Sequence, residues 1–156
     1  MGTRKPEDIR TLAVVSHGGA GKTSLTEAML FDTGAISRMG KVEDKNTVSD
    51  FDAEEHKRQI SISTAVTALS HKGRTLYVLD TPGFADFQGE QVCALRVADS
   101  ALLVVSGVHG VEVQTQRAWD QAEDLKIPAL FFVSKMDREH ADFEKTLSEI
   151  QESLSD

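Results

Sequence analysis

Apolar runs of strand length alternate with stretches of helical periodicity along most of this chain. The apolar runs predict strands near 10–16, 60–69, 74–80, 100–106 and 128–133. The amphipathic stretches predict helices over 22–31, 88–98, 112–125 and 139–154. Strands that alternate with helices are typical of a mostly parallel sheet covered by helices, so the pattern predicts an α/β fold.

Two breaks in this alternation carry information. The sequence His71-Lys72-Gly73 forms a tight turn between two apolar runs, which predicts one antiparallel hairpin at an edge of the sheet. From Asp32 to Arg58 the chain is polar and lacks sustained periodicity. A connection of this length inside a compact domain is usually either functional or disordered.

The length and composition suit a single domain over 1–156. The chain has 156 residues, 40% of them hydrophobic, and a formal net charge of −8, which argues against broad affinity for nucleic acids or membranes. Its single cysteine, Cys93, cannot form an intramolecular disulfide, and no apolar run approaches the roughly 18 residues of a membrane span. The polar start lacks a signal-peptide core, so we expect a reducing cytoplasm. We also expect this fragment to be a monomer.

A glycine-rich segment follows the first predicted strand and leads directly into a helix. Glycines let successive backbone N–H groups and the helix N-terminus point at one anion, as in a phosphate-binding loop. Lys22 would then bridge the β- and γ-phosphates, and Thr23 would ligate Mg²⁺. Ser16 stands where the usual pattern has glycine, and the alternative is a glycine-rich turn with a solvated lysine. The predicted nucleotide-binding residues are His17, Gly18, Gly19, Ala20, Gly21, Lys22, Thr23 and Ser24.

The third predicted strand ends in an acid and a tight turn, Asp80-Thr81-Pro82-Gly83. At the carboxyl end of a parallel sheet, Asp80 would lie beside the phosphate loop and hold Mg²⁺ through a bound water. Gly83 would offer a backbone N–H to the γ-phosphate, so this turn could sense whether that phosphate is present. The alternative is an ordinary turn, but its place downstream of a phosphate loop favours the functional interpretation.

The last predicted strand runs into Ser134-Lys135-Met136-Asp137, again at a carboxyl end. A carboxylate there can accept hydrogen bonds from both N1–H and N2–H₂ of guanine, a donor pair that adenine lacks. Lys135 would lay its aliphatic stem over the plane of the base. The alternative is a helix N-cap by Asp137 with a solvated Lys135. Together with the other two motifs, this segment predicts a guanine site on a P-loop NTPase three-layer sandwich.

These motifs strongly resemble the guanine-nucleotide domain of elongation factor G and its relatives among translational GTPases. The resemblance covers nearly the whole chain and extends to Gly110-Val111-Glu112, Gln114-Thr115, Trp119, Gln121-Ala122, Met136-Asp137-Arg138 and Ala141-Asp142-Phe143. It implies that Ser61, within Arg58-Gln59-Ile60-Ser61-Ile62, replaces the family's threonine whose hydroxyl reaches Mg²⁺. It also implies that the polar segment before it is a mobile, nucleotide-sensing switch, for which a merely solvated loop is the alternative.

Three residues depart from the family's pattern. Phe84 stands where the family has the histidine that orients the attacking water, and phenylalanine can neither donate nor accept that hydrogen bond. Gly19 replaces an acidic residue that helps to hold a monovalent cation, and Ser134 replaces an asparagine that ties the base-binding segment to the phosphate loop. We expect a divergent elongation factor G-like protein, and this chain to be its N-terminal fragment, without the last base-contacting loop and later domains.

The function predicted from the motifs and the resemblance is GTP or GDP binding with Mg²⁺ and slow GTP hydrolysis. Lys22 and Gly83 would act on the phosphates during the reaction, while Thr23, Ser61 and Asp80 would surround the metal. The ribosome is the expected partner of the full-length protein.

Two other functions compete with this one. A GTP-dependent binding module that does not hydrolyse GTP, and recruits a partner through its switches, is favoured by Phe84. An ATP-using P-loop enzyme is the weaker alternative, because adenine lacks the two donors that the Asp137 carboxylate would accept from.

Overall fold

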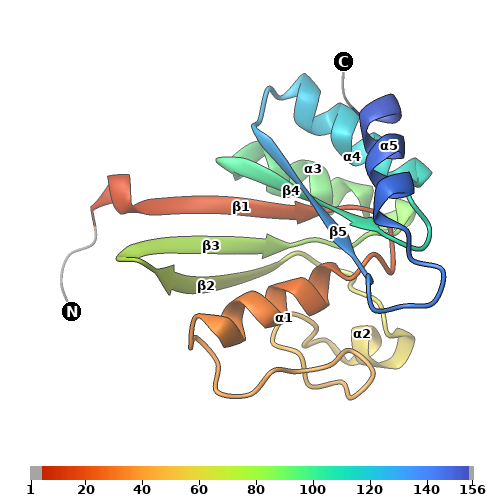
Figure 1. The fold of residues 1–156 in the computed structure, drawn as a ribbon. Coiled ribbons are helices and arrows are strands. Elements are labelled where there is room, and N and C mark those ends of the chain that lie inside the picture. Colours follow the sequence, from red (N-terminus) through yellow and green to blue (C-terminus); the bar gives the residue numbers. More distant parts are fainter. Residues whose placement is uncertain (1–4, 155–156) are drawn as a thin grey trace.

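One five-stranded sheet, with strand order β2-β3-β1-β4-β5, organises the molecule (Figure 1). This computed structural model describes residues 5–154. The strands are β1 (Ile9–Val15), β2 (Ala65–His71), β3 (Arg74–Asp80), β4 (Ser100–Ser106) and β5 (Ala129–Ser134). All neighbouring strands are parallel except β2 and β3, which form the antiparallel hairpin. The predicted α/β fold, mostly parallel with one antiparallel edge hairpin, is confirmed.

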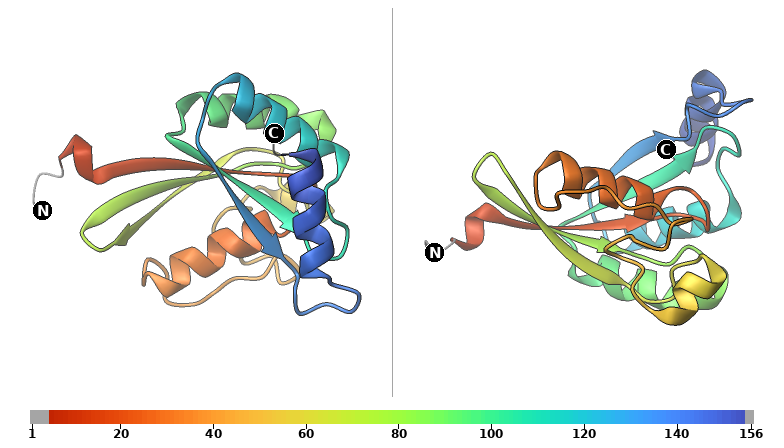
Figure 2. Two further views of the ribbon diagram at one scale, coloured as in Figure 1. Left: turned by 45° about the horizontal axis from the view of Figure 1, so that its top comes forward. Right: turned by 90° about the horizontal axis from the view of Figure 1, so that it is seen from below.

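Helices cover both faces of the sheet, as the views in Figure 2 show. Helix α1 (Lys22–Asp32) packs on one face, and α3 (Gln88–Val97), α4 (Val113–Asp124) and α5 (Phe143–Ser153) pack on the other. Because side chains alternate along a strand, Val14 packs in the cluster that contains α1, while Ala13 and Val15 pack in the cluster that contains α3 and α4. The central strand is therefore buried on both faces.

The polar connection contains a short helix, α2 (Ala53–Arg58), which is not among the predicted helices. The Asp52 side chain accepts from the backbone of Glu54, and the Glu55 carboxylate accepts from the backbone of Asp52. This reciprocal capping box satisfies backbone N–H groups at the start of the helix. The sequence contained that signal at the spacing Asp52-x-x-Glu55.

Two other boundaries differ from the prediction by more than two residues. Strand β2 begins at Ala65 instead of residue 60, because the backbone N–H groups of Ile62 and Ser63 donate to the Glu55 carboxylate. Helix α5 begins at Phe143 instead of residue 139, because the backbone N–H of Asp142 donates to the carbonyl of Gly107. In both places a group outside the element takes the hydrogen bond that a longer strand or helix needs.

The remaining elements are two short 3-10 helices, η1 (Pro6–Asp8) and η2 (Ala85–Phe87). Over residues 5–154, none of the helices has the length and apolar character needed to cross a membrane. Because β1, β3 and β5 run in the same direction, the segments that follow them meet at one edge of the sheet. These are the three segments in which the sequence predicts nucleotide-binding residues.

Candidate functional site

The predicted phosphate loop connects the end of β1 to the first turn of α1. Gly19 and Gly21 have φ values of 77° and 100°, in the left-handed region that favours glycine. Gly21 is also the N-cap of α1, and Lys22 is the first residue of that helix. The backbone therefore curls around the N-terminus of α1, which is the arrangement that concentrates N–H donors on an anion.

Lys22 is buried at the centre of this loop. Its ammonium donates to the carbonyl oxygen of His17 at 2.8 Å. Burial lowers the pKa of Lys22 to about 8, against the opposing attraction of Asp80 and Asp50. A buried ammonium that bonds to backbone carbonyls is a cation held where an anionic ligand would be attracted.

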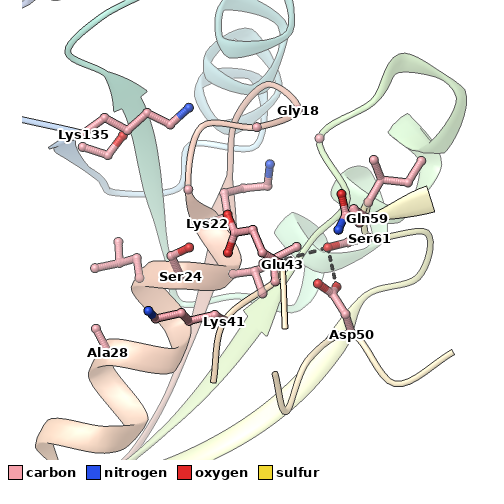
Figure 3. Close-up of a pocket in the computed structure, with 18 of the residues that line it drawn as sticks. Gly18, Lys22, Ser24, Ala28, Lys41, Glu43, Asp50, Gln59, Ser61 and Lys135 are labelled. Atoms are coloured by element: carbon pink, nitrogen blue, oxygen red, sulfur yellow. Dashed lines mark hydrogen bonds between the residues drawn. The ribbon is translucent and has the colours of Figure 1, made fainter. Parts of the chain in front are cut away.

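Two hydroxyls and two carboxylates lie together beside Lys22. The hydroxyls of Thr23 and Ser61 are 3.3 Å apart, and the Ser61 hydroxyl donates to the Asp50 carboxylate at 2.7 Å (Figure 3). Asp80 is 1% exposed, and the hydroxyls of Thr23 and Ser49 lie near its carboxylate. Neither carboxylate oxygen of Asp80 accepts a hydrogen bond of normal geometry from the described residues.

The unpartnered carboxylate of Asp80 fits a cation site. Burial raises the pKa of Asp80 to about 6, although the Thr23 hydroxyl and Lys22 favour the charged form. A buried acceptor without a donor costs free energy unless a ligand satisfies it. Hydroxyl and carboxylate oxygens are the ligands that Mg²⁺ takes, directly or through water, so Thr23, Ser61 and Asp80 form a donor set suited to that ion.

Gly83 lies directly against the phosphate loop. A side-chain carbon added to Gly83 would collide with the carbonyl oxygen of His17 and the ammonium of Lys22. Only glycine allows this close approach. The structure thus places the predicted γ-phosphate turn next to the buried lysine.

Phe84 packs over the phosphate loop while remaining 44% exposed. A Cβ added to Gly18 would lie 2.9 Å from the Phe84 ring, so the ring occupies the space above that glycine. An apolar ring therefore stands where the resemblance expects a water-orienting histidine.

The His17 side chain is directed away from the loop's backbone and towards α4. Its Nδ1 lies 2.8 Å from the Thr115 hydroxyl, and its Nε2 lies 3.2 Å from the Glu112 carboxylate. Burial, reinforced by the charges of Lys22 and Lys135, lowers the pKa of His17 to about 4, so the imidazole is neutral at pH 7. Its side chain anchors the loop to the helix layer and leaves its backbone carbonyl for Lys22.

The predicted base-binding segment follows β5 and faces the same cleft. Ser134 donates its hydroxyl proton to the carbonyl of Ala20 at 2.6 Å, so this serine still ties the segment to the phosphate loop. Lys135 has a φ of 58°, in the left-handed region. The Asp137 side chain is 80% exposed and lies 3.7 Å from the Arg138 guanidinium. The carboxylate is thus open to solvent and to a ligand.

A cleft of about 1160 Å³ joins the phosphate loop to the base-binding segment. Most of the predicted site residues line it; they are Gly18, Gly19, Gly21, Lys22, Thr23, Ser24, Ser61, Gly83, Ser134, Lys135 and Asp137. His17, Ala20 and Asp80 are buried and are not among its lining residues. Figure 3 shows the labelled lining residues converging from the loop, from α1 and from the polar connection.

The sequence analysis missed three acidic residues that organise the polar connection. Glu27 of α1 is fully buried and accepts from the backbone of Gly40 and Val48 at 2.8 and 2.5 Å. The Glu55 carboxylate accepts from the backbone N–H groups of residues 62 and 63, and the Asp50 carboxylate accepts from the Ser61 hydroxyl. The capping box could have revealed Glu55, but nothing local in the sequence distinguishes Glu27 or Asp50 from a solvated acid.

Comparison with known proteins identifies the family. The family described as "Elongation factor Tu GTP binding domain" matches residues 7–156. The chain belongs to this family. Its membership confirms the predicted resemblance to the guanine-nucleotide domain of translational GTPases and establishes a GTP-binding domain.

Similar members of the family include two proteins named "Ribosome-releasing factor 2, mitochondrial". The one from Yarrowia lipolytica is 41% identical over 146 residues, which are 94% of this chain and 18% of that protein. The one from Drosophila grimshawi is 42% identical over 147 residues, which are 94% of this chain and 20% of that protein. The chain therefore spans about a fifth of the length of these relatives.

A solved structure has the same fold. The crystal structure of a protein from Thermus thermophilus superposes with a TM-score of 0.90 at 42% identity, covering 94% of this chain and 22% of that one. The fold described above is therefore also found in an experimentally determined structure.

Proposed function

We propose that this domain binds GTP and GDP with Mg²⁺ and that, alone, it hydrolyses GTP slowly. The observation that carries the proposal is the position of Phe84, whose apolar ring packs on Gly18 beside the buried Lys22. The phosphate end of the cleft has a cation, a glycine turn and a set of metal-binding oxygens. It has no hydrogen-bonding side chain at position 84 to orient a water.

The phosphates and metal have a complete set of candidate partners. Lys22 would neutralise the β- and γ-phosphates, and the backbone of Gly83 would donate to the γ-phosphate. Thr23, Ser61 and Asp80 would hold Mg²⁺, with Asp50 acting through the Ser61 hydroxyl. When bound, Mg²⁺ stabilises the negative charge that develops on the phosphate oxygens.

Guanine selection rests on Asp137. Its exposed carboxylate can accept from the two donors on the guanine edge, and Lys135 can cover the base with its aliphatic stem. Adenine would leave the carboxylate without those donors. GTP is therefore the proposed substrate and ATP is not.

Phe84 accounts for the slow rate. A group that orients or deprotonates the attacking water commonly contributes about 10²–10⁴-fold to the rate, and a phenyl ring cannot do either. The domain would thus retain the phosphate-binding and metal-binding groups while lacking this contribution.

Single-turnover hydrolysis with the intact natural protein that carries this chain tests the proposal. Phe84→His should increase the rate, because imidazole can hydrogen-bond to the water, whereas Phe84→Leu should leave it slow. The increase should be smaller than about 10²–10⁴-fold if Gly19, which replaces the family's acidic residue, also limits the rate of hydrolysis. A parent that is already as fast as its histidine variant, with and without ribosomes, would show that Phe84 does not limit hydrolysis. No turnover by any variant, with GTP bound, would favour a non-hydrolysing binding module.

The proposed partner of the whole protein is the ribosome, because the relatives are named ribosome-releasing factors. Co-sedimentation of the intact protein with ribosomes, in GDP and in a non-hydrolysable GTP analogue, would test this. The cytoplasmic location stays a prediction, since the names of these relatives place them in mitochondria. Fractionation of the native cells decides it.

A further inference from the structure

Gln91, on α3, joins the two loops that form the phosphate end of the cleft. Its side-chain amide nitrogen donates to the Ser16 carbonyl at 3.0 Å and to the Pro82 carbonyl at 2.6 Å. The residue is only 3% exposed, so neither bond competes with bulk water. One buried amide therefore links the phosphate loop to the turn that carries Gly83.

The chemistry of the partners requires this orientation of the amide. Both partners are backbone carbonyl oxygens, which only accept hydrogen bonds. Only the NH₂ end of the Gln91 amide, with its two hydrogens, can satisfy both at once. A carboxylate of the same shape would face both carbonyls with an acceptor and could not form either bond.

We propose that Gln91 is a positioning residue that latches the Pro82-Gly83 turn against the phosphate loop. The proposal rests on the proposed nucleotide site, and it adds a specific role for a buried side chain that does not line the cleft.

Two other contacts hold the same turn. The Thr81 hydroxyl donates to the Val14 carbonyl at 2.7 Å, and the Phe84 ring packs on Gly18. Both flanks of Gly83 are therefore attached to β1 or to the loop after it. The Gln91 amide adds the link between the carbonyl just before Gly83 and the start of the phosphate loop.

The latch should matter for the triphosphate and not for the diphosphate. If the turn already lies against the loop, GTP does not have to draw it in, and the apparent affinity is not reduced by a small population of the competent state. GDP lacks the γ-phosphate that Gly83 would contact. Loss of the latch should therefore weaken the GTP analogue selectively.

Nucleotide affinities of two Gln91 variants in the intact natural protein test this. We expect Gln91→Glu, which keeps the shape and reverses the polarity, to bind a non-hydrolysable GTP analogue about tenfold more weakly. Gln91→Met, which keeps the volume without donors, should show a smaller loss in the same direction. GDP affinity should change less than about twofold in both. Gln151→Glu, the same charge change on the exposed face of α5, is the matched control and should bind like the parent.

The outcomes separate the two proposals. A parent that binds neither GDP nor the analogue refutes the nucleotide site itself. A parent that binds both, together with Gln91 variants whose analogue-to-GDP ratio is unchanged, refutes only the latch. Equal weakening of both nucleotides would also refute it, because a purely structural role affects GDP as well.

A measurement on the parent avoids any folding defect of the variants. Amide hydrogen exchange at Gly83 and Phe84 should remain slow in the GDP complex, and similar to the complex with the GTP analogue. Fast exchange at these amides in the GDP complex would show that the turn leaves the loop when the γ-phosphate is absent, and would overturn the proposal.

Discussion

The two ends of the cleft are built in opposite ways. At the phosphate end, Lys22 and Asp80 are buried with exposures of 6% and 1%. Burial lowers the pKa of Lys22 and raises the pKa of Asp80, so in both residues it disfavours the charged form. At the base end, the Asp137 side chain is 80% exposed and its closest charged partner is a neighbouring surface arginine, 3.7 Å away. One end holds its charges in the protein interior, and the other holds them in water.

This difference shows where a ligand would gain most. A buried charge without a full set of partners costs free energy in the empty domain, and phosphate with its metal would offset that cost. An exposed carboxylate costs little in the empty domain and contributes mainly by discriminating between bases. We therefore expect the phosphate end to supply affinity and the base end to supply specificity.

The strongest test of this contrast is Lys22→Ala. It removes the buried cation that would contact two phosphates, and charge-assisted hydrogen bonds contribute roughly 1.5–3 kcal/mol each, so GTP affinity should fall about a thousandfold. Isothermal titration calorimetry with GTP and GDP measures the loss. Thermal melting should show that the domain still folds. An unchanged affinity would contradict the assignment of the phosphate loop.

The next largest effect concerns the stability of the empty domain. Because the folded-state pKa of Asp80 is raised from 3.8 to about 6, the folded domain binds more protons than the unfolded chain between these values. The Asp80 contribution to stability is therefore lost as pH rises through this window. Without nucleotide and Mg²⁺, Asp80→Asn should be more stable than the parent at pH 7, by up to about 3 kcal/mol.

Urea unfolding of parent and Asp80→Asn between pH 4 and pH 7 measures that difference. The gap between the two proteins should widen from about pH 4 to about pH 6 and then stay constant, and the variant should lose Mg²⁺-dependent nucleotide binding. A gap that does not depend on pH would mean that folding does not raise the pKa of the Asp80 carboxyl.

A smaller effect is expected at the base end. Asp137→Asn replaces an acceptor by an amide that can also donate, which suits the extra carbonyl of xanthine. GTP affinity should fall about a hundredfold, xanthosine triphosphate affinity should rise, and melting of the empty domain should not change. A variant that still prefers GTP would leave Asp137 as a surface residue of the turn.

The smallest effect should follow from the contact between the two ends. Ser134→Ala removes the hydroxyl that donates to the Ala20 carbonyl, so both stability and GDP affinity should fall by about 1 kcal/mol. Ser148→Ala removes an exposed hydroxyl bond within α5 and serves as the control. Equal behaviour of the two variants would show that the two ends of the cleft are not coupled through Ser134.

Much of the fold could be predicted because its signals are local. The alternation of apolar runs and amphipathic stretches predicted every strand and the four longer helices, and the tight turn at His71-Lys72-Gly73 predicted the edge hairpin. The two largest boundary errors occurred where a group outside the element takes a backbone hydrogen bond. Glu55 ends the extended segment before β2, and Gly107 holds the residue before α5.

The sequence by itself determined the motifs of the site, because the chemistry of glycine, lysine and carboxylate groups at fixed spacings after strands depends only on local residues. It also determined that position 84 is apolar. Only the tertiary structure decided which of these groups are buried. Burial lowers the pKa of Lys22 and raises that of Asp80, whereas the Asp137 side chain is exposed to solvent. The tertiary structure alone revealed that Glu27, Asp50 and Gln91 join segments that lie between 11 and 75 residues apart in the chain. Burial and long-range hydrogen bonds depend on which segments meet in space, and no local pattern of residues specifies that meeting.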